Sequence, residues 1–167
     1  MNDQASMRRT VRILARASLV CVLVLALGRL PAGAMLAGPA GTLTVLEGRV
    51  EHARGSGPMG PASSGADLAE GDRVVTGADG RALITFLDGT TVTVEPGTQI
   101  TVRELAAAPR EPSRVRLLIL TGTLWARVGG WLGGRGTVTL ESNAYSATAR
   151  DGLIGAQSRR DGAFVSW

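Results

Sequence analysis

Glycine residues recur at nearly even intervals in the middle of this chain, and this spacing constrains the fold more than any other feature. Gly71, Gly80, Gly89 and Gly97 lie 9, 9 and 8 residues apart, and each stands beside an Asp or a Pro. Such pairs form tight turns, because glycine readily adopts the positive φ that many turns need. The intervals leave room for strands of about six residues, a common strand length.

Between these turns, and again after residue 113, apolar and polar residues alternate with a period of two. The apolar members are Ala82, Ile84 and Phe86; Val92 and Val94; Ile100 and Val102; Val115, Leu117 and Ile119; Leu124, Ala126 and Val128; and Val138 and Leu140. This period predicts strands that bury one face. Two prolines predict a loop over residues 106–113. The predicted class is all-β: short antiparallel strands with tight Asp-Gly turns, forming a β-sandwich or a short β-solenoid.

The first 34 residues differ in composition from the rest of the chain. Residues 1–16 are polar and basic, and residues 17–27 are apolar. Ala32 and Ala34 place small side chains at the two positions that signal peptidase reads, so we predict an N-terminal signal helix, cleaved after Ala34. A retained signal anchor is the alternative. Either form puts the remaining chain in the periplasm or cell envelope, because the arginines hold the N-terminus inside.

The basic character of the chain belongs to this N-terminal segment. Five of the 18 basic residues and one of the 14 acids precede residue 35, which leaves 13 of each in the remainder. A nucleic-acid-binding domain needs a clustered basic excess, so nucleic acid is excluded as a partner. We interpret residues 35–42 as a linker and residues 43–167 as one β domain. Its halves, 35–102 and 103–167, carry net charges of −4 and +4, which either separate into layers or ends of the domain or cancel locally.

Side chains that commonly perform catalysis are scarce. The chain has one histidine and one cysteine, and Cys21 lies in the apolar N-terminal run. We interpret His52 as a solvated surface residue. Asp72, Asp79 and Asp88 adjoin the turns, and turn formation explains them better than a calcium site, which needs its oxygen ligands in one place. We therefore predict a non-catalytic protein that holds no cofactor and no metal.

Residues 129–136 surround a Trp-Leu pair with glycines, and apolar side chains displayed in this way often mark a contact surface. The alternative is that the Trp covers the end of a sheet. Trp and Arg are enriched at binding hot spots, and guanidinium groups recognise carboxylate or phosphate. The expected partner is thus an envelope protein or an anionic wall polymer. The predicted partner-binding residues are Trp131, Leu132, Arg127 and Arg135, with Arg114 and Arg116 as additions.

Two further positions carry structural expectations. Trp125 alternates with Leu124 and Ala126, so its side chain is expected to face outward or into a second layer, and packing under a neighbouring loop is the favoured arrangement. Ala163–Trp167 follows an Asp-Gly turn and has no later strand to cover it. We expect it to form a terminal strand at a sheet edge, where it could pair with another chain.

The turns and strands carry motifs in a fixed order: Gly71-Asp72, Val74, Thr76-Gly77, Asp88-Gly89-Thr90, Pro96, Thr98, Gly122, Leu124-Trp125 and Val128. These motifs resemble those of the extracytoplasmic domain of the FecR family. The resemblance runs from about Leu43 to the C-terminus. Residues 140–144 and 149–152 depart from the family pattern, although Arg150 is kept, and family members usually continue with a further strand, so the domain is expected to be short there.

This resemblance implies an extracytoplasmic sensing or binding module. FecR regulators relay the state of an iron-siderophore receptor to a sigma factor, using a cytoplasmic domain before their membrane helix. Only residues 1–16 precede the apolar run here, which is too short for such a folded domain. We therefore expect a non-catalytic FecR-like binding module of the envelope, reaching the membrane only through its N-terminal segment. The alternative is a membrane-anchored signal-relay regulator.

Overall fold

The computed structural model describes residues 41–106, 113–129, 136–159 and 164–166, which fall within the compact unit Gly38–Trp167. The predicted signal segment, with Ala32 and Ala34, lies outside these residues, so the signal helix and its cleavage stay predictions. Most of the loop predicted over residues 106–113 also lies outside them, although Ala106 ends one strand and Ser113 immediately precedes another.

The described residues form strands and no helix, which confirms the all-β class. The strands are β1 (Gly41–Glu47), β2 (Val50–Ala53), β3 (Gly60–Pro61), β4 (Ala66–Leu68), β5 (Arg73–Thr76), β6 (Arg81–Phe86), β7 (Thr91–Val94), β8 (Gln99–Ala106), β9 (Arg114–Val128), β10 (Thr137–Glu141), β11 (Ser146–Ala149), β12 (Gly152–Ser158) and β13 (Phe164–Ser166). β1 thus takes in Gly41 and Thr42 from the segment interpreted as a linker.

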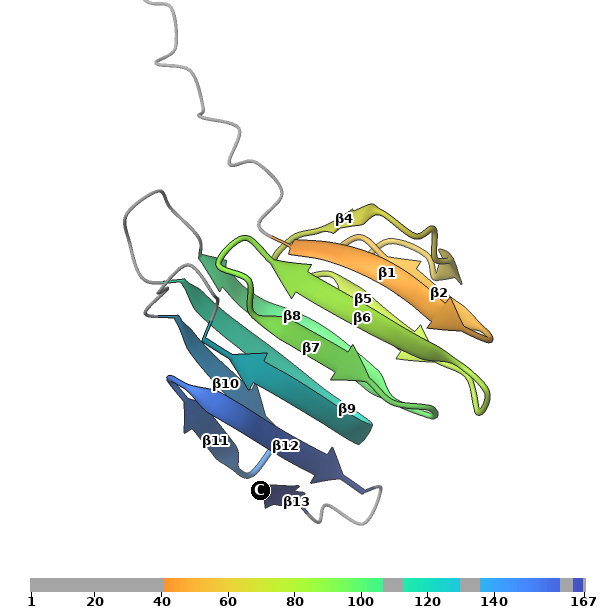
Figure 1. The fold of residues 1–167 in the computed structure, drawn as a ribbon. Helices are drawn as coiled ribbons and strands as arrows, with labels where there is room; N and C mark the ends of the chain where they lie inside the picture. Colours follow the sequence, from red (N-terminus) through yellow and green to blue (C-terminus); the bar gives the residue numbers. More distant parts are fainter. Residues whose placement is uncertain (1–40, 107–112, 130–135, 160–163, 167) are drawn as a thin grey trace, which may run out of the picture. The chain divides into compact units, whose positions relative to one another are not determined.

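All thirteen strands belong to one sheet that curls strongly into a half-barrel (Figure 1). Its β6 side has the order β4-β1-β6-β7-β9-β12-β13, and its β8 side has the order β3-β2-β5-β8-β9-β10-β11. The long strand β9 belongs to both sides, so the architecture is one curled sheet, which corrects the predicted β-sandwich or short β-solenoid. Each side combines early and late strands, so the acidic and basic halves of the sequence do not form separate layers. They occupy opposite ends of the sheet instead, because the strands up to β8 lie on one side of β9 and β10 to β13 lie on the other.

The bend that joins the two sides lies at Gly122, in the middle of β9. The first half of β9 pairs with β8 and β10, and the second half pairs with β7 and β12. Gly122 has a φ of 99°, and a Cβ here would collide with the backbone of Thr98. Only glycine combines this conformation with this close approach. The two strand segments predicted for residues 115–128 are therefore real, but they are joined without an intervening loop.

The core lies on the concave face of the curled sheet and includes every apolar residue that the alternating pattern places inward. Leu43, Ile84, Ile100, Leu117 and Leu140 are fully buried, and they come from both sides of the sheet. Burying a side chain of this size stabilises the fold by about 1.5–3 kcal/mol. One pairing departs from the expected antiparallel pattern, because β10 runs parallel to β9.

The turns agree with the sequence at most of the glycines. Gly71, Gly89 and Gly97 have positive φ values, as the turn signals predict. Gly80 does not, which corrects the role we assigned to it. A Cβ at Gly80 would collide with the carbonyl oxygen of Arg49, so glycine is needed there for close packing between turns.

The two lateral edges of the half-barrel are finished differently. At one edge the chain from β3 to β4 seals the sheet, with Ala62 donating to the Val50 carbonyl at 2.9 Å and Gly65 donating to the Leu43 carbonyl at 2.8 Å. At the other edge β13 pairs with β12 alone among the described strands. This confirms the predicted terminal edge strand over Phe164–Ser166, while its pairing with another chain stays a prediction.

Candidate functional site

The convex surface of the β6 side carries two rows of side chains that run across five strands. These residues alternate with core residues, so they point away from the core. Cross-strand pairing aligns them directly opposite one another. We call this surface the β6 face; its first row is Thr42, Thr85, Thr91, Arg127 and Leu153, and its second row is Thr44, Leu83, Thr93, Trp125 and Gly155.

Trp125 lies against Gly155 on the neighbouring strand β12. A Cβ at Gly155 would stand 2.5, 2.7 and 3.0 Å from three atoms of the six-membered part of the indole. The indole therefore covers the glycine backbone, which is buried beneath it, while Trp125 itself is only partly buried. The outward orientation predicted for Trp125 is confirmed, but a strand rather than a loop supports the ring.

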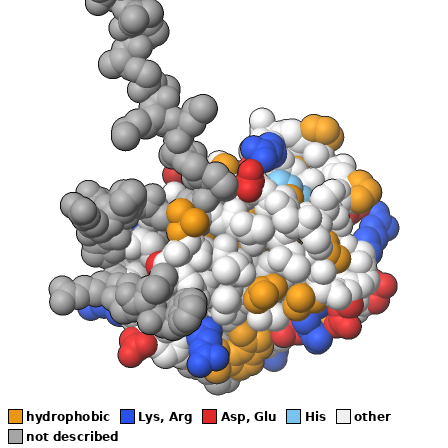
Figure 2. All heavy atoms as spheres, turned by 45° about the horizontal axis from the view of Figure 1, so that its top comes forward, with side chains coloured by type: hydrophobic (Ala, Val, Ile, Leu, Met, Phe, Trp, Pro, Cys, Tyr) orange, Lys and Arg blue, Asp and Glu red, His pale blue; other side chains and the backbone are white. Residues whose placement is uncertain are grey.

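The β6 side also carries exposed side chains of two kinds, apolar and charged. Leu153 is 65% exposed and lies directly opposite Arg127, which is also exposed. Leu87, in the turn that follows β6, is 66% exposed. Charged side chains of both signs gather along one edge of the space-filling view, whereas uncharged groups occupy its centre (Figure 2).

The convex surface of the β8 side carries ion pairs. We call this surface the β8 face; its residues are Glu104, Arg114, Arg116, Thr139, Glu141 and Thr148. Arg114 and Arg116 bond the same carboxylate of Glu104, at 3.0 and 3.4 Å, and Arg116 also reaches Glu141 at 3.2 Å. These two arginines were expected to extend the surface around Arg127. They lie instead on the other half of β9, where neighbouring strands neutralise them.

Of the four predicted partner-binding residues, only Arg127 belongs to the described part of the chain. Trp131, Leu132 and Arg135 lie outside it. The glycines on either side of that segment are described: a Cβ at Gly129 would stand 2.6 Å from Oδ1 of Asp151, and Gly136 adjoins Asp88 and Ser113. Sequence reasoning missed the threonine rows and Leu153, because cross-strand register is not visible in a single strand.

His52 is a partner of a buried carboxylate, which corrects the surface role that we assigned to it. Its side chain is 12% exposed, and Nε2 lies 3.0 Å from Oδ2 of Asp72, which is 3% exposed. Asp72 also accepts hydrogen bonds from the backbone N–H groups of Gly55 and Ala69, both at 3.0 Å. The group therefore ties β2, the loop after it and the turn before β5 together, and its role is structural.

Asp88 is the turn former that the sequence predicts, whereas Asp79 contacts the backbone of a residue distant in sequence. Asp88 accepts a hydrogen bond from the backbone N–H of Thr90 at 2.9 Å, and it also accepts one from the hydroxyl of Ser113. Asp79 lies 3.5 Å from the backbone nitrogen of Arg49. Among the described residues, no cluster of His, Cys, Asp or Glu side chains is suited to holding a metal ion.

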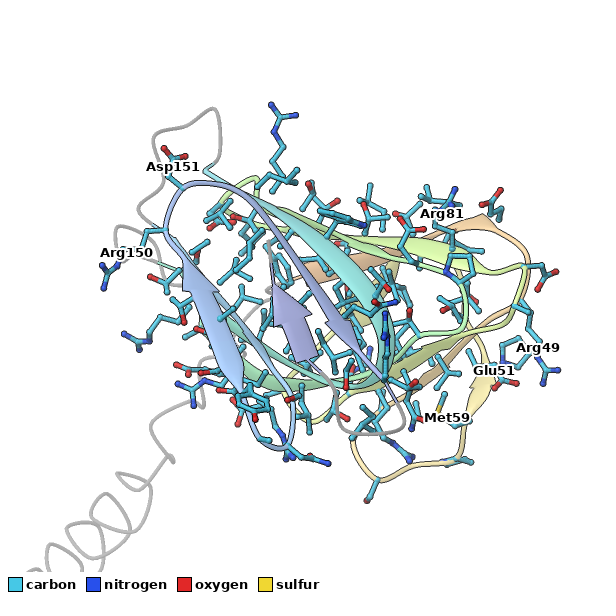
Figure 3. All side chains as sticks on the ribbon, turned by 90° about the horizontal axis from the view of Figure 1, so that it is seen from below. Arg49, Glu51, Met59, Arg81, Arg150 and Asp151 are labelled. Carbon is cyan, nitrogen blue, oxygen red and sulfur yellow. The ribbon has the colours of Figure 1, made fainter. Side chains whose placement is uncertain are left out.

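A cleft of about 360 Å³ opens between β1, β2 and the segment after β3, with Val45, Val50 and Ala62 in its lining. The Arg49 guanidinium at its rim bonds Glu51 at 2.6 Å, and this hydrogen bond and the carboxylate charge raise the pKa of Arg49. Figure 3 shows this pair at the same end of the sheet as Arg81, opposite Arg150 and Asp151. The cleft offers an apolar lining with an already balanced charge pair.

Comparison with known proteins identifies one family. A sequence profile described as FecR protein matches residues 72–166, more than half of the chain. No curated protein matches. No solved structure matches. The match begins at Asp72, yet β1 pairs with β6 and β2 pairs with β5, so the strands before the match complete the same sheet. No helix within the described residues is long and apolar enough to span a membrane.

Proposed function

Because the chain belongs to the FecR family, we propose that it is a binding and sensing module of the cell envelope that recognises its partner through the β6 face. FecR domains are generally modules of sensing and signal relay in sigma-factor regulation. They are typically periplasmic, and the proteins that carry them are generally non-catalytic regulators. The proposal places this chain outside the cytoplasm and gives it no catalytic role.

One observation supports the choice of surface: among the described residues, the arginines on the first half of β9 form ion pairs, and Arg127 on the second half forms none. Arg114 and Arg116 are already bonded to carboxylates, whereas Arg127 is exposed between Thr91 and Leu153. Arg is one of the residue types enriched at binding hot spots. Trp131, Leu132 and Arg135 remain in the proposal as further contacts, on sequence grounds alone.

A second candidate function is a membrane-anchored signal relay, which the family match favours. In that form residues 17–27 stay attached and hold the module at the membrane. Intact mass of the exported protein separates the two forms. A chain that begins at Met35 supports the cleaved module, and a chain that begins at Met1 and fractionates with membranes supports the anchored relay.

Binding to envelope fragments tests the proposed surface. The exported chain is mixed with fragments from cells that lack it, and the bound fraction is measured by sedimentation. We expect the double variant Arg127→Gln/Leu153→Ser to bind about tenfold more weakly, which corresponds to about 1.4 kcal/mol.

The matched control is Arg116→Gln/Leu120→Ser, which removes one Arg and one exposed Leu from the first half of β9. It should bind like the wild type. Equal losses in both double variants, or none in the Arg127→Gln/Leu153→Ser variant, would contradict the proposed surface.

A further inference from the structure

The β6 face offers a flat aromatic ring among hydroxyl groups. The Trp125 indole rests on the backbone of Gly155, which fixes it across the sheet surface. The face of an aromatic ring is electron-rich and attracts polarised C–H groups. A pyranose ring presents such C–H groups on its flat side, so the supported indole is suited to stacking against a sugar.

The threonines of the two rows supply groups that match sugar hydroxyls. Within the residues described, the hydroxyls of Thr42, Thr44, Thr85, Thr91 and Thr93 form no hydrogen bond with another protein group. A hydroxyl both donates and accepts, as a sugar hydroxyl does. Neighbouring strands lie about 4.8 Å apart, close to the length of one pyranose unit in an extended chain. The rows can therefore bond successive sugars laid across the strands.

Arg127 adds a charge requirement to this surface. It follows Trp125 by two residues, so both side chains leave the same face of β9. Its neighbours in register, Thr91 and Leu153, carry no charge. A guanidinium bonds a carboxylate through two parallel N–H donors, which complements an acidic sugar.

The spacing of the apolar groups favours a polysaccharide over a protein surface. Leu87 and Leu153 are separated in the sheet by β7 and β9, with Thr91 and Arg127 between them. Protein interfaces usually bury a continuous apolar centre, and these leucines do not form one. We propose that the β6 face binds a polysaccharide that carries carboxylate groups, an inference that rests on the proposed function and names the partner's chemistry.

Three soluble probes test this with the exported chain: polygalacturonate, uncharged dextran and polyglutamate. We expect polygalacturonate to bind at least about tenfold more tightly than either of the others, because only it combines sugar rings with carboxylates. Equal binding of polyglutamate would show that charge alone is recognised and would overturn the inference. If dextran binds as tightly as polygalacturonate, carboxylate groups are not required, and this result would also overturn the inference.

Substitutions on the β6 face test which side chains contact the polysaccharide. Arg127→Gln should weaken polygalacturonate binding about tenfold and reduce its dependence on salt. Gly155→Ala should weaken binding while leaving Trp125 in the sequence, since the new Cβ displaces the indole. Trp125→Phe keeps a smaller ring over Gly155 and should retain part of the affinity. The control Arg116→Gln, on the β8 face, should bind like the wild type.

The result that separates this inference from the proposed function uses envelope fragments treated with protease. If the chain fails to bind all three probes, and its binding to envelope fragments is abolished by the protease, then the partner is a protein. The polysaccharide inference would then be wrong, while the proposed function would stand. If the wild-type chain does not bind untreated envelope fragments, both the polysaccharide inference and the proposed function are wrong.

Discussion

The β6 and β8 faces share strand β9 but treat their arginines in opposite ways. On the β8 face, Arg116 stands opposite Glu104 and bonds both this carboxylate and that of Glu141. On the β6 face, Arg127 stands between Thr91 and Leu153. The same type of side chain therefore forms ion pairs with neighbouring strands on the β8 face, whereas on the β6 face it forms no ion pair within the described part of the chain.

This difference indicates that cross-strand register, rather than residue type, determines whether an arginine on this sheet forms ion pairs with its neighbours. Each β9 residue faces two neighbours supplied by strands that are distant in sequence. Two carboxylates near Arg116 satisfy its charge, and exposed pairs of this kind contribute little to stability. The two register neighbours of Arg127 are uncharged, which is why the proposal assigns its charge to a ligand. The bend at Gly122 makes the contrast possible, because it moves β9 from one set of neighbours to the other.

The largest expected effect comes from breaking the bend that separates the two faces. We predict that Gly122→Ala destabilises the protein by about 3 kcal/mol or more, because it adds a strained positive φ to a collision with Thr98. Urea unfolding followed by circular dichroism measures the change.

Gly97→Ala is the matched control for this variant. Gly97 also has a positive φ, of 67°, but a Cβ there meets nothing within 4 Å. The Gly97→Ala variant should lose only about 1–2 kcal/mol of unfolding free energy, because only the strained backbone conformation contributes. Similar losses at the two positions would mean that close approach to Thr98 is unimportant.

Local patterns in the sequence predict the strands and their inward residues well, because period two follows directly from strand geometry. The inward positions of β6, β7, β8 and both halves of β9 are all buried as expected. The parallel pairing of β10 with β9 could not be predicted this way, since alternation carries no information about strand direction. The contact between His52 and Asp72 spans 20 residues, and neither position has a local signal for it.

The candidate site was predicted less completely, for the same physical reason. Arg127 could be placed outward by alternation, and the structure agrees. The support of Trp125 by Gly155, and the alignment of threonines from three strands, depend on register between distant segments. Arg114 and Arg116 were expected beside Arg127 because the bend at Gly122 was not foreseen.

An intermediate effect is expected from removing the aromatic cover of the β6 face. We predict that Trp125→Ala destabilises the protein by about 1–2 kcal/mol, because it exposes the Gly155 backbone and removes a large, partly buried ring. Thermal unfolding gives the change. Leu153→Ala, on the same face but 65% exposed, should stay within about 0.5 kcal/mol of the wild type. A neutral Trp125→Ala variant would show that the ring contributes to binding only.

The smallest expected effect concerns how salt concentration changes the loss of stability caused by a substitution on each face. Glu104→Gln removes the carboxylate shared by Arg114 and Arg116, whose side chains are 63% and 48% exposed. Solvent screens such pairs, so the loss should be about 0.5 kcal/mol at low salt. It should vanish near 1 M salt, where the screening length is about 3 Å. Thr85→Val, on the β6 face, removes a hydroxyl without touching a charge, and its effect should be the same at both salt concentrations. If Glu104→Gln were equally insensitive to salt, these ion pairs would not hold the β8 arginines electrostatically, and their contrast with Arg127 would rest on geometry alone.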